Sequence, residues 1–497
     1  MVGPNYTGPP PAAPLAASAA SAAATFPRAP RAPVTSAPPL AAWWNALGDS
    51  TLDRLEAQAL TNSPTVEQAR ARILAARATM GEQRAGPLPE GGATASSAYA
   101  RIPDTGMITR KASGGGDTGP RNFSLYSLGS DASWEIDLFG GTRRQFANAT
   151  ARLQASQADL QDAQVTLTKN VATAYIGLRA AQQRLLLARQ TEDLRARILT
   201  LTQQRRRLGT ASDGDVETAM TELEQAQGNL HPVAAQADTY LDELAALLGQ
   251  EPGTLDALIG APAALPLPPA QTAIGNPADL LRRRPDIRAA DRRLAAVNET
   301  IEANIAQYFP QVSLLGFVGV VSNGTANLLS SRNLTALGVP SLTWNILDFP
   351  KIGPHVKEAR ANYAAQEASY RQTVLLALRD ANEALSTFGH RNETVATLID
   401  RQASADHLAS IARLRNDAGT ASTLTRAQGR DRPDRGAGRA GAGTGRTRRG
   451  LDNTPEHAGV GVGGAGARVS DTCTFRLIRT SATIHVGRWR SGTGSSG

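Results

Sequence analysis

The sequence predicts an α+β membrane protein of two internal repeats, built mostly of long α-helices with four β-strands per chain. Three observations predict this class. One stretch of the chain runs far beyond ordinary helix length without a proline, and several short segments alternate apolar and polar residues. Several motifs also recur at a nearly constant spacing, which is typical of a repeated supersecondary unit.

The first repeat is expected at 41–250, after an N-terminal arm. Residues 1–40 are rich in proline and alanine with only two arginines, which predicts an extended, weakly ordered segment. Strands are expected at about 91–139, where Gly, Ser, Thr and aromatic residues replace the helical pattern. Within them, 133-SWEIDLFG-140 alternates apolar and polar side chains, which indicates a strand with one apolar face.

Long helices are expected at about 142–248. From 142 to 208 the chain has no proline and one glycine, so a continuous helix there would be roughly 100 Å long at 1.5 Å per residue. Its leucines recur at seven-residue intervals among alanines, a narrow stripe that suits helices packed side by side. A glycine turn ends this helix, and a second long helix is expected at about 216–248.

The second repeat is expected at 276–425, after a proline-rich linker at 251–275. Trp344 stands 210 residues after Trp134 in a similar motif, and Gly419 stands 210 residues after Gly209 in a matching GTAS turn. By this correspondence, strands are expected at about 311–349 and helices at about 354–418.

Four strands with one apolar face cannot close a barrel alone. Their unpaired edges would promote aggregation unless other strands cover them. Barrels built jointly by several chains solve this problem, and alternating strands with an aromatic residue at the boundary are typical of membrane barrels.

The composition argues against enzymatic and nucleic-acid-binding roles. The net charge of +8 lies entirely in the tail, because the residues from Arg426 onward hold 13 Arg and 5 acidic residues while the preceding 425 hold 39 of each sign. A single cysteine, Cys473, and six scattered histidines predict no disulfide framework, metal site or catalytic residues, and no cofactor is expected. No run of about 18 apolar residues predicts a transmembrane helix.

The last segment, 426–497, departs from the repeat. In the first repeat, Gly209 is followed by a predicted helix of about thirty residues. The corresponding part of the second repeat, 429–450, holds 7 Gly and 7 Arg with no Leu, Ile or Val. Because glycine costs about 1 kcal/mol per helical site, this segment cannot supply the equivalent helix. Three explanations remain: a shifted reading frame near 424–430, which we favour because the break falls inside a repeat unit; a disordered extension; or an RNA-binding tail, which would lack stacking aromatics.

These elements together resemble the outer-membrane factor (TolC-like) family, and specifically its OprM/NodT-like lipoprotein branch. Their order and spacing over residues 1–424 carry the resemblance. The similar segments are VGPNY at 2–6, WW at 43–44, SWEIDLFG at 133–140, DLLRRRPDIRAADRRLAAVN at 279–298, YFPQVSL at 308–314 and VLLALRDANEAL at 374–385.

The resemblance implies a homotrimer in which each protomer gives four strands to a twelve-stranded outer-membrane β-barrel, while its helices form a periplasmic α-barrel. It implies a passive export conduit for drugs or other small molecules, embedded in outer-membrane lipid. The implied partners are a periplasmic adaptor (membrane fusion protein) and an inner-membrane pump of the RND type. The alternative is a periplasmic coiled-coil structural or adaptor protein without a channel, which would not need two strand hairpins.

The resemblance also bears on both ends of the chain. In the lipoprotein branch the VGPNY-type segment follows a lipidated cysteine at the end of a signal peptide, and Met1 stands close to that position. We therefore expect a signal peptide and lipid-bearing cysteine upstream of this sequence. We also expect the chain as written to assemble poorly as a trimer, because the last long helix is not matched.

The candidate functional residues lie at the two turns between long helices. The simple interpretation is helix capping, with glycine adopting positive φ and serine capping the next helix. The resemblance implies that the same turns form the tunnel tip that docks the adaptor, with a possible pore mouth nearby. The tip residues are Leu208, Gly209, Thr210, Ser212, Gly419, Thr420 and Ser422, and the possible pore-mouth residues are Asp213, Asp215 and Arg415.

Overall fold

The computed structural model describes residues 6–9, 34–35, 41–102, 121–269, 271–273 and 282–420, and these divide into two units. Unit 1 holds residues 1–10, 73–156 and 290–370, and unit 2 holds the rest. Ser422 and the tail from Arg426 therefore lie outside the described residues, as does most of the N-terminal arm. Within the described ranges, every helix is too short or too polar to cross a bilayer.

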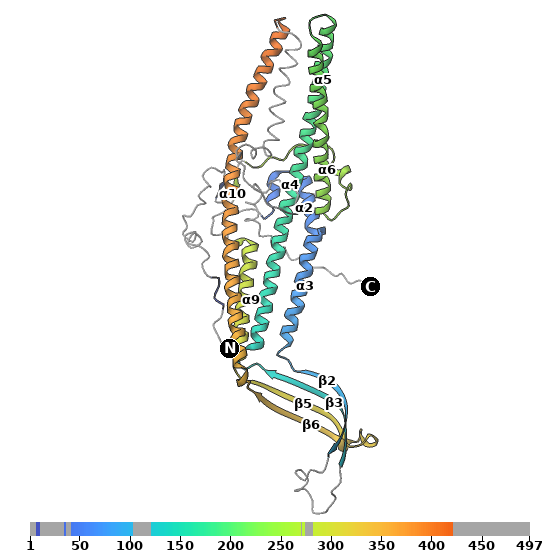
Figure 1. Cartoon of the computed structure of the whole chain (residues 1–497), viewed down its shortest axis with the longest axis vertical. Coiled ribbons are helices and arrows are strands. Elements are labelled where there is room, and N and C mark those ends of the chain that lie inside the picture. The colour runs from blue at the N-terminus through green and yellow to red at the C-terminus, as the bar shows by residue number, and fades with distance from the viewer. Residues whose placement is uncertain are drawn as a thin grey trace, which may run out of the picture. The chain divides into compact units, whose positions relative to one another are not determined.

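Unit 1 contains one four-stranded antiparallel sheet (Figure 1). Its strands follow the order β2 (Glu90–Ile102), β3 (Arg121–Ile136), β5 (Gln311–Ser322) and β6 (Leu334–Thr343). The strands fall within the ranges expected from the sequence, apart from the first residue of β2. The central pairing, β3 with β5, joins the hairpins of the two halves of the chain.

One face of this sheet is apolar. Side chains of paired residues share a face, so Trp134 lies on the same face as Leu314, its partner in β5. Leu128, Val318 and Leu342 lie on that face by the same register, and all five side chains are exposed. The opposite face is mixed: it carries Leu315 and Leu337 but also two serine pairs whose hydroxyls lie 2.7 Å apart, Ser96 with Ser127 and Ser313 with Ser341.

A glycine pair brings β3 and β5 into close contact. Gly129 pairs with Gly319, and a Cβ atom added to either would lie 2.9 Å or less from neighbouring backbone and from the Phe317 ring. The ring covers the space that two side chains would otherwise fill, an arrangement that suits a bent sheet. The sheet curves along its strands in Figure 1.

Two tryptophans tie the strands to the segments before them. The Trp134 indole N–H donates to the Pro87 carbonyl at 2.8 Å, and the Trp344 indole N–H donates to the Tyr308 carbonyl at 3.0 Å. Both tryptophans stand just before a long helix in the sequence, which predicts packing at the junctions between strands and helices, and these hydrogen bonds lie at those junctions.

The helical part of unit 1 packs through small side chains. Parts of α3 (Pro64–Ala85), α4 (Gly141–Arg207), α9 (Pro285–Ala306) and α10 (Phe349–Asp417) belong to it. Ala151 of α4 packs against Ala295 and Ala296 of α9, and Tyr6 contacts this cluster. A buried ion pair joins the same two helices, with Arg144 Nη1 and Glu299 Oε2 2.8 Å apart.

Helix α9 departs from what the sequence predicted for its first turns. Residues 281–293 interleave aspartates with arginines, a pattern that predicts a solvated helix face. The Arg284 side chain is instead buried and pairs with Asp286 at 2.7 Å, while Asp291 accepts a 2.6 Å hydrogen bond from the Tyr6 hydroxyl. Burial raises the pKa of Tyr6, so its hydroxyl keeps the proton that it donates. Asp286 thus neutralises the one arginine of this segment that the fold buries, while Arg282, Arg283, Arg288 and Arg293 remain exposed as expected.

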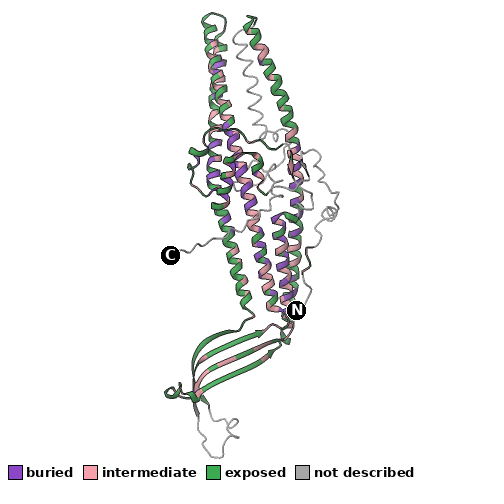
Figure 2. Cartoon of the chain, turned by 180° about the vertical axis from the view of Figure 1, so that it is seen from behind, coloured by how far each residue is buried: buried purple, intermediate pink, exposed green. Residues whose placement is uncertain are grey.

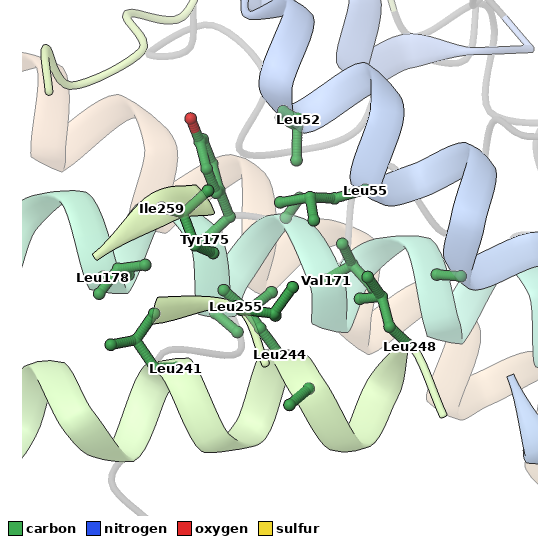
Figure 3. Close-up of a cluster of buried hydrophobic side chains, with 14 of the residues drawn as sticks. Leu52, Leu55, Val171, Tyr175, Leu178, Leu241, Leu244, Leu248, Leu255 and Ile259 are labelled. Atoms are coloured by element: carbon green, nitrogen blue, oxygen red, sulfur yellow. The ribbon is translucent and has the colours of Figure 1, made fainter. Parts of the chain in front are cut away.

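Unit 2 contains the main hydrophobic core (Figure 3). It is formed by the middle of α4, by α2 (Ser50–Asn62), by α6 (Leu230–Leu247) and by the short α7 (Asp256–Ile259). Trp44 of the 3₁₀ helix η2 (Trp43–Leu47) is buried in the same core. Fully buried members drawn in Figure 3 are Leu52, Leu55, Val171, Tyr175, Leu178, Leu244, Leu248 and Ile259.

A chain of hydrogen bonds crosses this core. Asp49 caps α2 by accepting from the Thr51 and Leu52 backbone N–H groups, and it also accepts from the Tyr175 hydroxyl at 2.7 Å. One turn further along α4, buried Arg179 donates to the Ala261 carbonyl at 2.9 Å. These bonds hold the start of α2 and the linker between the halves against the middle of α4.

The helix that follows the first turn is interrupted, although the sequence predicted a single helix at about 216–248. Helix α5 (Asp213–Gly228) and helix α6 are separated at Asn229, whose backbone stays in the right-handed helical region. The cause is Pro232, which has no N–H to donate to the Gly228 carbonyl and whose ring crowds that carbonyl. The hydrogen-bond ladder of the helix is broken at this point.

Unit 2 also contains a two-stranded parallel pairing that the sequence did not reveal. Val34–Thr35 (β1) pairs with Thr272–Ala273 (β4), so the N-terminal arm meets the linker between the halves. The burial pattern of the helices is drawn in Figure 2, where the buried residues gather on the facing sides of the bundled helices.

Candidate functional site: the two helix tips

The two candidate turns lie at the same end of unit 2, at the α4–α5 connection and at the C-terminal end of α10 (Figures 1 and 2). Gly209 has φ +70° and Gly419 has φ +73°, a region that residues with a side chain rarely adopt. Both glycines are exposed, with open space where a Cβ would lie. The sequence-based interpretation of these glycines as helix ends is confirmed.

The two turns share the same hydrogen bonds. In the first, the Thr210 N–H and hydroxyl both donate to the Arg205 carbonyl, at 2.9 and 3.1 Å. In the second, the Thr420 N–H and hydroxyl donate to the Arg415 carbonyl, at 2.9 and 3.0 Å. In each turn, the backbone hydrogen bond from the threonine N–H satisfies one of the last carbonyl groups of the helix, as in a Schellman motif.

Ser212 caps the helix that follows the first turn. Its hydroxyl accepts from the Asp215 N–H at 3.1 Å, and its own N–H donates to the Asp215 carboxylate at 2.9 Å. This is a reciprocal capping box, and it holds the pKa of the Asp215 carboxyl below its usual range. Asp215 therefore has a structural role at the start of α5.

Asp213 forms an ion pair across the first turn. The Arg206 guanidinium approaches its two carboxylate oxygens at 2.5 and 2.9 Å and holds the pKa of Asp213 below its usual range. Both side chains are exposed. Arg206 was not identified as a site residue, although an arginine run directly before the turn and an acidic residue directly after it signalled such a pair.

The two tips differ in their surfaces. Leu208 is an apolar side chain with 78% exposure, and Ala418 holds the equivalent position in the second turn. Arg415 is exposed and has no ion-pair partner in the described part of the chain, whereas its equivalent Arg205 donates to the Thr210 carbonyl at 3.0 Å. An exposed leucine beside basic side chains suits contact with another protein.

The tips do not form a catalytic or metal site within the ranges described. No group of three His, Cys, Asp or Glu side chains there could hold a metal ion. The only described residues near the tips with shifted pKa values are Arg206, Asp213 and Asp215, and their own turn accounts for each shift.

Comparison with known sequences places the chain in a family. The family model described as outer membrane efflux protein matches residues 55–250 and 276–432, which is more than half of the chain. The chain belongs to this family of outer-membrane efflux channels, whose members are transport conduits rather than enzymes.

Individual relatives share the same description. Outer membrane protein OprJ of Pseudomonas aeruginosa is 31% identical over 346 residues, which cover 69% of this chain and 70% of OprJ. The toluene efflux pump outer membrane protein TtgI of Pseudomonas putida is 30% identical over 389 residues, covering 76% of this chain and 78% of TtgI. The resemblance stated from the sequence is confirmed.

Solved structures share the fold. The outer-membrane channel OprN is 31% identical with a TM-score of 0.77, over 89% of this chain and 96% of OprN. The CmeC outer membrane channel of Campylobacter jejuni, at 20% identity, has the same fold with a TM-score of 0.73 over 82% of this chain and 85% of CmeC. The family membership decides against the alternative of a coiled-coil adaptor without a channel.

Proposed function

We propose that the chain is the outer-membrane channel subunit of a tripartite efflux system driven by an RND-type inner-membrane pump. It is a passive conduit for drugs or other small molecules. The observation that carries this proposal is the sheet of unit 1, which is antiparallel and open, with one apolar face. Relatives named as efflux components, among them the toluene efflux protein TtgI, support the direction of transport.

Three copies together form the channel. Among the described strands, β2 and β6 each have one neighbour, so each presents an unpaired edge. Pairing β2 of one copy with β6 of the next closes a barrel of twelve strands from three copies, with the Trp134 face toward lipid. The helices of the three copies form a periplasmic tunnel, since narrow apolar stripes leave them dependent on neighbours for burial.

The helix tips dock a periplasmic adaptor. Leu208, Gly209, Thr210 and Ser212 form one docking turn, and Gly419 and Thr420 with Ser422 form the other. Exposed Leu208 supplies apolar contact, and the closed turns supply a rigid surface. Asp213, Asp215 and Arg415 line the pore mouth, where the ion pair of Asp213 with Arg206 lowers the charge available to a passing ion.

The matching turns and tryptophan contacts support a two-repeat chain. The protein lies in the outer membrane with its helices in the periplasm, tethered by a lipidated cysteine upstream of Val2. The segment from Arg426 onward comes from a shifted reading frame. Resequencing codons 424–430, together with N-terminal sequencing of the native protein, tests both ends of this proposal.

Disulfide trapping between the two sheet edges tests the trimer. With Cys473→Ser as background, Ala336→Cys in β6 is combined in turn with Ala93→Cys, Ala95→Cys and Ser97→Cys in β2, which share the face of Ala336, since the shear of the barrel sets which pair meets. Oxidation in native membranes is expected to give dimer and trimer bands with at least one pair, and none with either cysteine alone. A ladder continuing past three copies, or monomer alone with every pair, would contradict the closed trimer.

Membrane fractionation and transport test the function. The protein is expected in the outer-membrane fraction, and it should lower intracellular accumulation of a fluorescent efflux substrate in cells that lack their own channel but keep pump and adaptor. Recovery in the soluble periplasmic fraction would instead support an adaptor. Assembly is expected to be inefficient, so a minor trapped trimer is the predicted outcome of the disulfide experiment.

A further inference from the structure

The loop between β5 and β6, residues 323–333, begins with the one asparagine of the chain that is followed by glycine, Asn323–Gly324. Asn323 is exposed. An asparagine before glycine is chemically reactive, because the backbone nitrogen of the next residue can attack the side-chain amide when no Cβ obstructs the approach. Whether this reaction occurs in the folded chain depends on what holds the glycine nitrogen.

The Gly324 nitrogen is weakly held. Its N–H donates to the Ser322 hydroxyl oxygen at 3.3 Å, which is longer than most N–H···O hydrogen bonds, and no backbone carbonyl of the described residues accepts from it. The backbone of Gly324 is extended, with φ −151° and ψ 153°. The space where its Cβ would stand is open to 4 Å. Reaction at this nitrogen therefore meets little steric resistance.

Two other asparagines of the same loop are held more firmly. Asn327 and Asn333 are followed by Leu328 and Leu334, whose branched side chains stand beside the attacking nitrogen. The N–H groups of both leucines donate to backbone carbonyls. The Asn333 side-chain amide also donates to the Asn327 carbonyl at 2.6 Å. These residues are internal references for the reactivity of Asn323.

The chain contains one Asp–Gly pair, Asp213–Gly214, which could form the same ring with loss of water. There the Arg206 guanidinium holds both carboxylate oxygens, and Gly214 lies in the first turn of α5. The ion pair lowers the pKa of Asp213, so the carboxyl stays ionised, and a carboxylate is a poor acceptor for a nucleophile. The sequence thus contains two candidate dipeptides, and the structure leaves Asn323–Gly324 as the reactive one.

We propose that Asn323 is a self-modification site, which deamidates through a cyclic imide formed with the Gly324 nitrogen. Hydroxide from solvent takes the amide proton, and the nitrogen forms a bond to Asn323 Cγ. The Cγ–Nδ2 bond breaks, and the departing nitrogen leaves as ammonia after taking a proton from water. A second water then opens the ring at one of its two carbonyls, which gives aspartate or isoaspartate. The net reaction consumes one water and needs no cofactor.

The modification changes the charge of the loop. Residues 323–333 contain one charged side chain, Arg332, so the net charge of the loop falls from +1 to zero when Asn323 becomes acidic. The isoaspartate product also lengthens the backbone by one carbon directly after the end of β5. The β5–β6 loop therefore loses its positive charge as the protein ages. This inference requires neither the trimer nor the export activity.

Peptide mapping by mass spectrometry tests the proposal. The purified full chain is kept in detergent at pH 8 and sampled over several days. Aspartate and isoaspartate are expected to accumulate at Asn323, while Asn327 and Asn333 stay intact and Asp213 forms no isoaspartate. Chain unfolded in guanidinium gives the rate of the unprotected dipeptide, and the native chain should react within about tenfold of that rate.

Two variants identify the route. Gly324→Ala places a Cβ beside the attacking nitrogen, and the extended backbone and open space accept it without a change of fold, so deamidation should be roughly tenfold slower. Thr325→Ala, at the next exposed position, is the matched control and should stay within about twofold of the wild-type rate.

Several outcomes would overturn the proposal. A native rate more than about tenfold below that of the unfolded chain would show that the fold protects Asn323. An equal rate in Gly324→Ala and wild type would exclude the cyclic imide. Conversion of Asn327, Asn333 or Asp213 as fast as that of Asn323 would show that the contacts of the glycine nitrogen do not select the site.

Discussion

The outer halves of α4 and α10 end in matching turns, yet they differ in what covers them. The α4 segment has an ion pair and a buried isoleucine under α5, while the equivalent α10 segment has an exposed leucine. Turn geometry is therefore local, set by a glycine and a threonine, whereas burial depends on a returning helix. The same difference separates the interior of unit 2, where α2, α4 and α6 enclose a core, from its exposed helical ends.

The largest expected effect on folding stability comes from Glu56, whose carboxyl group lies in the core of unit 2. Its side chain is 0% exposed on the same face of α2 as Leu52 and Ala59, and both oxygens lack hydrogen-bond partners. Burial, with a smaller contribution from the Asp53 charge, raises the pKa of Glu56 to about 9. The native state thus keeps a proton that the unfolded state loses above its ordinary pKa of 4.5.

Stability from this group is fully present below about pH 4.5 and is lost as the pH rises toward 9. The loss has an upper bound of about 6 kcal/mol. Glu56→Leu should raise stability at pH 8 and flatten the slope, measured by denaturant unfolding at pH 5 and pH 8. Glu67→Leu, at an exposed site in α3, is the control and should keep the wild-type slope. The Glu56→Leu variant should keep a smaller dependence of stability on pH, because burial also raises the pKa values of Glu243 and Glu302.

The next effect compares equivalent positions on the two long helices. A Cβ at Gly177 of α4 would lie 2.6 Å from the Tyr240 ring of α6, while the equivalent residue in α10 is Thr387. Gly177→Thr should cost about 2 kcal/mol because α4 and α6 must move apart. Thr387→Ala should change stability by no more than about 0.5 kcal/mol. Equal costs in denaturant unfolding would show that α10 is covered as well as α4.

A smaller effect is expected at the turns, where the halves are alike. Gly209→Ala and Gly419→Ala each place a Cβ on a residue with φ near +70°, at a cost of about 1 kcal/mol. The two penalties should agree because neither site has a neighbour within 4 Å of the added atom. Thermal unfolding of both variants, with the exposed helical Gly81→Ala as a control, measures the difference.

The smallest effect is expected for the exposed ion pair of the first tip. Asp213→Asn removes the contact with Arg206, which has no counterpart in the second tip, where Asn416 replaces the arginine. Exposed pairs contribute little, so the unfolding midpoint at pH 7 should not change measurably. The lowered pKa of Asp213 means that any contribution is present above its ordinary value of 3.8 and lost below it. A clear destabilisation at pH 7 would show that the pair holds the turn.

Local signals made most of the fold predictable. The absence of proline predicted α4 to within one residue at each end, and alternating residues predicted four strands. Gly209 and Gly419 were identified because positive φ requires glycine or a close substitute. The break at Asn229 was missed, although Pro232 signalled it.

Features that depend on distant contacts were not predictable. Glu56 looks like a surface glutamate of a helix, and only the packing of α2 shows that it is buried. The burial of Arg284 and the pairing of Val34–Thr35 with Thr272–Ala273 likewise join segments far apart in the chain. In the candidate site, the two turns were predictable from the sequence. The ion-pair partner of Asp213, Arg206, could be predicted only as one member of a run of arginines.

The hydrogen bonds of Trp134 and Trp344 make these residues built-in optical sensors. Each indole proton is held by a backbone carbonyl, of Pro87 in one half and of Tyr308 in the other. When a junction opens, the indole exchanges that carbonyl for water, and its emission moves to longer wavelength. Subtracting the emission of a variant in which one of these tryptophans is replaced by phenylalanine from that of the wild type isolates one junction from the other four tryptophans of the chain, without attaching any dye.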